Sequence, residues 1–158
     1  MIDFIYELNQ HTESILTPIH SEIQFNGNEI KIDRSIAINK LKTTLDKSSL
    51  VIVSGEGGVG KTAVIKDFYN NIKGSIPFFI FKATEFNISN INDLFKNYGS
   101  FTLLYFIREY QGVEAKYIVI DSAEKLSEIE HQETFQEFLS TLLDNHWKII
   151  FTTRYSYL

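Results

Sequence analysis

The chain has 158 residues, 44% of them hydrophobic and 14% aromatic, which is enough to bury a core and form one compact domain with a small extension. A formal net charge of −5 excludes a bulk basic field that would attract nucleic acid or an anionic membrane. The absence of cysteine excludes disulfides, thiolate metal sites and cysteine nucleophiles, and it agrees with a reducing compartment. Because the start shows no signal-peptide pattern and no apolar run approaches the ~20 residues of a membrane span, we expect a cytoplasmic protein without a membrane partner.

Two elements are expected ahead of the main domain. Apolar residues at near-helical spacing predict a short amphipathic helix over 2–15. Alternating apolar residues on both sides of Asn26-Gly27 predict a tight β-hairpin over 22–32. We therefore divide the chain into an N-terminal extension over 1–33 and a main domain over 34–158.

The main domain alternates helices with short apolar strands. Helices are predicted over 36–45, 61–72, 91–98, 100–110 and 128–145, and either Asp33 or Ser35 is expected to cap the first of them. Strands are predicted over 51–54, 76–81, 117–121 and 148–154. Strands that alternate with helices are joined by right-handed crossovers. We therefore expect an α/β fold of three layers, in which helices cover both faces of a parallel sheet.

The first predicted strand runs directly into a phosphate-binding motif. Residues 55–62 read Gly-Glu-Gly-Gly-Val-Gly-Lys-Thr, which matches the Gly-x-x-x-x-Gly-Lys-Thr P-loop between a strand and a helix. Glycines let successive N–H groups point at an anion, and the helix N-terminus adds partial positive charge. We expect Lys61 to reach the β- and γ-phosphates and the Thr62 hydroxyl to ligate Mg²⁺. The predicted nucleotide-binding residues of this stretch are Gly55, Glu56, Gly57, Gly58, Val59, Gly60, Lys61, Thr62 and Ala63.

An acidic residue stands at the end of the third predicted strand. Ligands of open parallel sheets bind outside the carboxyl ends of the strands, so side chains at those ends are candidates for the site. Asp121 follows four apolar residues, where an acid is costly to bury unless it meets a cation such as Mg²⁺ held by Thr62. We interpret Asp121 as the metal-binding Walker B carboxylate. The structural alternative is a cap for the helix that follows.

Two further residues near these strand ends are candidates for catalysis. Glu124 lies three residues beyond Asp121 and could orient or deprotonate the water that attacks the γ-phosphate, or it could be a solvated acid in a first helical turn. Arg154 could place a guanidinium on the γ-phosphate and distinguish ATP from ADP, or it could be a loop arginine. Thr152 and Thr153, just before it, are expected to serve as hydrogen-bonding supports. The predicted catalytic residues are Lys61, Glu124 and Arg154.

Four stretches of the sequence together resemble the STAND class of P-loop ATPases, the AAA+-related group that contains the NACHT and NB-ARC modules. They are Asp33-Arg34-Ser35-x-Ala37-Ile38-x-x-Leu41, Gly55 to Thr62, Ile118 to Glu124, and Ile149 to Arg154. The resemblance implies that Arg34 and its neighbours lie against the adenine or ribose. It assigns phosphate and Mg²⁺ binding to Lys61 and Thr62, and it makes Arg154 a sensor of the γ-phosphate. Such proteins are usually switches in which ADP holds a closed state and ATP licenses oligomerisation.

The sequence departs from that class in two ways. Lys125 stands where the class often has a second acid, so we expect hydrolysis to be slow or absent. The chain stops after the fourth of five expected core strands, before any helical lid, winged helix or sensor region. If the strand order is that of the class, the P-loop strand is an exposed edge. We therefore expect a fragment or a shortened product, whose self-association or signalling partners would engage missing C-terminal regions.

Three functions are consistent with these residues. The first is ATP binding with slow hydrolysis, as the nucleotide switch of a cytoplasmic signalling or defence protein. The second is a non-hydrolysing, nucleotide-dependent interaction domain, and the third is an AAA+ ATPase that acts on DNA as a loader or in transposition. The acidic balance argues against nucleic acid as a partner. A GTPase is disfavoured because the sequence has no Asn-Lys-x-Asp motif to recognise guanine.

Overall fold

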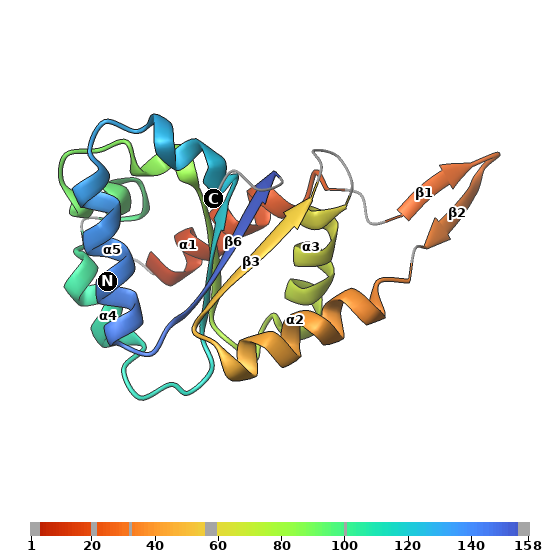
Figure 1. The fold of residues 1–158 in the computed structure, drawn as a ribbon, viewed down its shortest axis with the longest axis horizontal. Helices are drawn as coiled ribbons and strands as arrows, with labels where there is room; N and C mark the ends of the chain where they lie inside the picture. The colour runs from red at the N-terminus through yellow and green to blue at the C-terminus, as the bar shows by residue number, and fades with distance from the viewer. Residues whose placement is uncertain (1–3, 20–21, 32, 56–59, 100, 155–158) are drawn as a thin grey trace.

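A four-stranded parallel sheet forms the centre of the part of the chain that the structure describes (Figure 1). The structure is a computed structural model that describes residues 4–19, 22–31, 33–55, 60–99 and 101–154, with only the backbone described at 22–25 and 29–31. The strands are β3 (Leu50–Gly55), β4 (Phe78–Lys82), β5 (Tyr117–Asp121) and β6 (Lys148–Arg154). Their order is β3-β6-β5-β4, so the strand that leads into the P-loop lies at one edge of the sheet.

Helices cover both faces of this sheet, as the sequence predicts. On one face lie α2 (Ser35–Lys47) and α3 (Lys61–Ile72), whose apolar residues share a buried cluster with Val119 and Ile150. The other face carries α4 (Leu103–Glu109), α5 (Gln132–Asp144) and the short 3₁₀ helices η1 (Ala83–Phe86), η2 (Ile91–Tyr98) and η3 (Ala123–Glu128). The three-layer α/β fold is therefore confirmed.

The first helix closes the outer edge of the sheet. α1 (Phe4–Leu16) lies along β4, and its Thr12 hydroxyl accepts the Ile80 N–H at 3.2 Å. Phe4 and Leu8 pack in the cluster on one face of the sheet, whereas Leu16 packs in the cluster on the other. An edge strand exposes unpaired N–H and C=O groups, so α1 protects β4 in a way that no described element protects β3.

The predicted hairpin is present and projects away from the body of the molecule (Figure 1). β1 (Glu22–Phe25) pairs antiparallel with β2 (Asn28–Lys31). The two turn residues, Asn26 and Gly27, both have positive φ (51° and 78°), as the tight hairpin turn requires. Among the described residues, no helix is long and apolar enough to cross a membrane.

Several predicted boundaries differ from the structure, such as the helix predicted over 100–110, which is α4 (Leu103–Glu109), and two of the differences have clear local reasons. The strand expected from Ile76 begins at Phe78, because Pro77 has no N–H and supplies only its carbonyl, which accepts the Tyr117 N–H at 2.9 Å. The helix expected from residue 128 begins at Gln132, because Glu128 is the last residue of η3 and its C-cap residue, Ile129, is extended (φ −78°, ψ 146°).

The cap predicted for α2 is also different. Arg34 occupies the N-cap position and makes no side-chain capping bond there, so neither Asp33 nor Ser35 is the cap residue. The Asp33 carboxylate instead accepts the Ser35 N–H at 2.9 Å. This hydrogen bond lowers the pKa of Asp33, because it stabilises the ionised carboxylate.

Candidate functional site

The described end of the P-loop forms the start of α3. Gly60 is the N-cap residue and has φ +84°, a left-handed conformation that strains any residue with a side chain. Lys61 and Thr62, both half-buried, are the first two residues of the helix, where the helix dipole favours anions. The predictions for Glu56, Gly57, Gly58 and Val59 lie outside the described residues.

A cavity of about 480 Å³ opens beside this helix start. Its walls come from α2, β3 and the beginning of α3, and they include Gly55, Gly60 and Lys61. On the α2 side it is lined by Ala37, Lys40, Leu41 and Thr44. Such a volume is typical of a small-molecule site, and its mixed apolar and cationic walls suit a base next to phosphates.

Asp121 lies on the same face of the sheet as α3. Val119 and Ile150, two residues before Asp121 and Thr152, belong to the cluster under α3, and strand side chains alternate between faces. The Thr152 hydroxyl donates to Asp121 Oδ1 at 2.7 Å. The half-buried carboxylate is therefore held at the end of β5 on the face that carries Lys61 and Thr62.

Glu124 and Arg154 are in direct contact, but through the backbone of the arginine. The Arg154 N–H donates to Glu124 Oε1 at 2.9 Å. In the parallel pairing of β3 with β6, Arg154 stands opposite Gly55, the first glycine of the P-loop. The structure thus brings both candidate catalytic residues to the end of the sheet where the P-loop begins, and the exposed Arg154 side chain makes no part of the bond to Glu124.

Arg34 lies against the start of α3. Its guanidinium forms an ion pair with Asp67, with 3.2 Å between Nη1 and Oδ2. A β-carbon built on Gly60 would lie 4.0 Å from the Arg34 Nε, so this side chain borders the last glycine of the P-loop. The position agrees with a place near the nucleotide, and contact with the adenine or ribose stays a prediction.

Asp67 is the part of the site that sequence reasoning missed. Asp67 lies 33 residues from Arg34 and carries no motif, so nothing in the sequence pairs them. The expected hydrogen-bonding support is confirmed for Thr152 and wrong for Thr153, whose buried hydroxyl has no hydrogen-bond partner among the described residues. The sequence could have distinguished the roles of Thr152 and Thr153, because adjacent side chains of a strand lie on opposite faces of the sheet and only one of the two can face Asp121.

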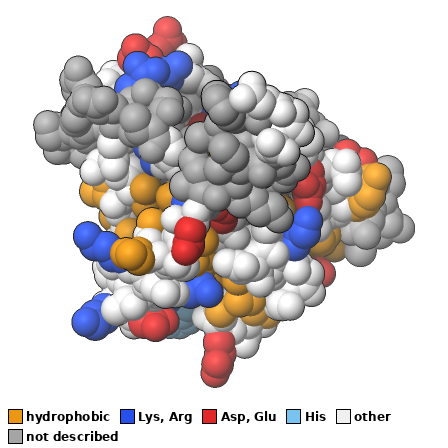
Figure 2. All heavy atoms as spheres, turned by 90° about the vertical axis from the view of Figure 1, so that its right-hand side faces the viewer, with side chains coloured by type: hydrophobic (Ala, Val, Ile, Leu, Met, Phe, Trp, Pro, Cys, Tyr) orange, Lys and Arg blue, Asp and Glu red, His pale blue; other side chains and the backbone are white. Residues whose placement is uncertain are grey.

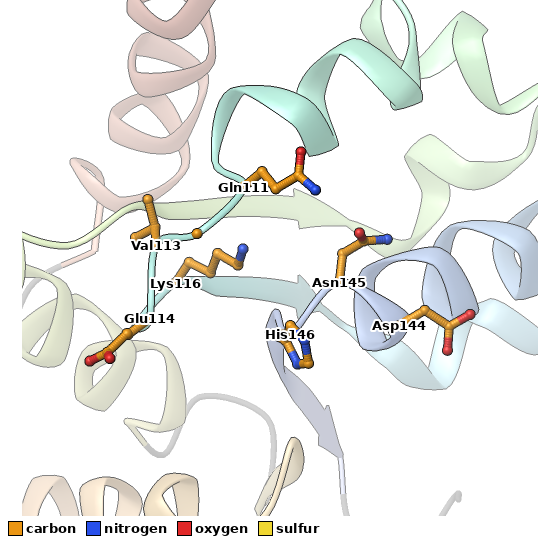
Figure 3. Close-up of a pocket in the computed structure, with 8 residues that line it drawn as sticks. Gln111, Val113, Glu114, Lys116, Asp144, Asn145 and His146 are labelled. Carbon is orange, nitrogen blue, oxygen red and sulfur yellow. The ribbon is translucent and has the colours of Figure 1, made fainter.

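A second cavity, of about 460 Å³, lies at the amino ends of β5 and β6, away from the ends that carry Asp121 and Arg154 (Figure 3). Its lining includes Lys116, which is buried and donates to the Tyr110 carbonyl at 2.9 Å. The Lys116 ammonium also lies 5.5 Å from the centre of the Trp147 ring. Burial lowers the pKa of Lys116. In parallel sheets ligands bind at the carboxyl ends of the strands, so this cavity is separate from the candidate site.

Two solved structures share this fold. The chain has the fold of P-loop ATPases. It is similar to AMPPCP-bound DnaA from Aquifex aeolicus, with a TM-score of 0.54 and 21% identity over 88% of this chain and 41% of that one. It is also similar to a Walker-type ATPase of Pyrococcus abyssi, with a TM-score of 0.57 and 17% identity over 87% of this chain and 49% of that one.

Both similarities cover only part of the other protein. The chain spans less than half the length of either protein. No protein-family model matches the sequence, and no curated protein matches it either. The likeness therefore establishes the fold, and the arrangement of residues within the site must support any function.

Proposed function

We propose that this chain binds ATP with Mg²⁺ and hydrolyses it slowly, as the nucleotide-switch module of a STAND-type signalling or defence protein in the cytoplasm. The observation that carries the proposal is the position of β6 between the P-loop strand and the Asp121 strand. Through β6, Arg154 stands opposite Gly55 while Thr152 holds Asp121. A P-loop and a strand-end acid on the two strands that flank β6 are the parts from which a nucleotide site is built.

The residues present suit each part of the nucleotide. Lys61 would bind the β- and γ-phosphates, assisted by the N-terminus of α3. Thr62 and Asp121 would hold Mg²⁺, which neutralises phosphate charge when bound. The apolar part of the 480 Å³ cavity would receive the base, with Arg34 beside the loop.

Glu124 is the candidate base for hydrolysis. Because the Arg154 N–H occupies Oε1, the second carboxylate oxygen is left to accept a proton from the attacking water. Lys125, in place of a second acid, is exposed and can neither hold the metal nor accept a proton as a carboxylate would. Slow turnover is therefore expected.

Steady-state phosphate release tests the catalytic role. Glu124→Gln should lower turnover by about 10²–10⁴-fold, the usual contribution of a general base, with ATP affinity unchanged. Glu128→Gln is the matched control, because Glu128 is an exposed acid of the same short helix, and it should release phosphate at the original rate. Equal turnover in Glu124→Gln and the original chain would leave the second candidate, a domain that binds nucleotide without hydrolysing it.

An AAA+ ATPase that acts on DNA is the third candidate, because the same fold would serve it. On the described part of the face shown in Figure 2, basic side chains are interspersed with acidic and hydrophobic ones and do not form one basic field. The net charge of −5 points the same way. DNA binding whose affinity falls steeply as salt rises would favour this candidate over the switch.

A further inference from the structure

The hydroxyl of Thr152 connects Asp121 to the turn that follows β5. Thr152 is fully buried, and its Oγ1 donates to Asp121 Oδ1 at 2.7 Å. The same oxygen accepts the Ser122 N–H at 3.0 Å. One hydroxyl therefore acts as both donor and acceptor, and it fixes the carboxylate together with the backbone that carries it.

The turn at Ser122 needs such support. Ser122 has φ +60° and ψ 50°, the left-handed conformation that residues with a side chain rarely adopt. It comes directly after Asp121 and is the N-cap residue of η3, which carries Glu124. A change in this turn would move both candidate acids, so the bond from Ser122 to Thr152 contributes to the position of each.

Thr153 provides a natural comparison. It is as fully buried as Thr152, yet its hydroxyl finds no hydrogen-bond partner among the described residues. Adjacent strand residues point to opposite faces, so Thr153 lies away from Asp121. Substituting each threonine in turn therefore distinguishes the effect of a lost hydrogen bond from the effect of changed packing.

We propose that Thr152 is a positioning residue for Asp121 and that it sets the affinity of the nucleotide complex for Mg²⁺. The inference rests on the proposed function, in which Asp121 holds the metal. A hydrogen bond to Oδ1 fixes the rotation of the carboxylate and leaves Oδ2 for Mg²⁺ or its bound water. Outer-shell partners of this kind typically change metal affinity by about 10- to 100-fold.

The experiment titrates Mg²⁺ into the full chain in the presence of AMPPCP and measures binding by calorimetry. A second series, in EDTA, measures the affinity for AMPPCP without Mg²⁺. Thr152→Val should raise the Mg²⁺ midpoint by about 10- to 100-fold and leave the affinity for AMPPCP in EDTA unchanged. Thr152→Ser keeps the hydroxyl and should restore the original midpoint. Thr153→Val, the matched control, should titrate like the original chain.

Several results would overturn the inference. An unchanged Mg²⁺ midpoint in Thr152→Val would do so, as would an equal shift in Thr153→Val, which would assign the effect to packing. If Thr152→Val fails to fold by circular dichroism, Thr152→Ala replaces it, and an equal loss in Thr152→Ala and Thr152→Ser excludes a role for the hydroxyl. If the original chain and Lys61→Ala bind AMPPCP alike, the proposed function itself has failed.

Discussion

Arg154 has two groups, its backbone N–H and its side chain, whose roles a single substitution can separate. Its backbone N–H holds Glu124, and any residue other than proline at this position keeps that bond. Its exposed side chain belongs to the residue in register with Gly55, and in the proposed function its guanidinium contacts the γ-phosphate. The side chain is therefore the part that would distinguish ATP from ADP.

We predict that Arg154→Ala weakens ATP binding by about tenfold, which corresponds to about 1.4 kcal/mol, and leaves ADP binding unchanged. Calorimetry with each nucleotide and Mg²⁺ measures the two affinities. Arg108→Ala, an exposed arginine of α4, should change neither. An equal loss for both nucleotides would show that Arg154 supports the fold and does not sense the γ-phosphate.

Among the elements, β5 is preceded by a buried lysine, Lys116, whose charge the fold does not need for stability. Lys116 is buried, its pKa is lowered by desolvation, and the Tyr110 carbonyl it bonds also accepts the Val113 N–H at 3.2 Å. A methionine would fill similar space against Trp147 and leave that carbonyl partnered.

We predict that Lys116→Met raises the free energy of unfolding at pH 7 by about 1 kcal/mol, because no buried ammonium remains to be desolvated. The direction in which stability changes with pH follows from the lowered pKa of Lys116. The unfolded chain binds the lysine proton more tightly, so the original chain gains stability as pH rises toward the ordinary lysine value, and the variant lacks this gain. Urea denaturation from pH 7 to 10 measures the difference, with exposed Lys47→Met as control. If Lys116→Met is less stable than the original chain at every pH, the buried ammonium does not destabilise the fold.

At the scale of the whole molecule, the sequence predicted the architecture better than the detail. Alternating apolar strands and helices identified the parallel sheet, because that pattern is local and repeated. The expected exposure of the P-loop strand is also confirmed, with β3 at the edge and the Ile52 side chain 48% exposed. By contrast, nothing local shows that α1 would cover β4, since the bond from Ile80 to Thr12 joins residues 68 apart.

The candidate site was predictable to the same degree. The P-loop and Asp121 come from contiguous motifs, whereas the contact of Glu124 with Arg154 depends on two strand ends meeting in space. The sequence pattern also could not distinguish a 3₁₀ helix from an α-helix. The apolar spacing of the eight residues of η2 fits either kind of helix. What the sequence could not supply are the contacts between distant segments, and these hold the acids in place.

The most direct test of the nucleotide site is calorimetric titration of ATP with Mg²⁺ into the original chain, Lys61→Ala and Lys73→Ala. Lys61 begins α3 and Lys73 follows its last residue, so the two variants remove the same charge from opposite ends of one helix. We predict that Lys61→Ala weakens binding by at least about 100-fold with an unchanged circular dichroism spectrum, and that Lys73→Ala binds like the original. Equal ATP affinity in the original chain and Lys61→Ala would contradict the nucleotide site.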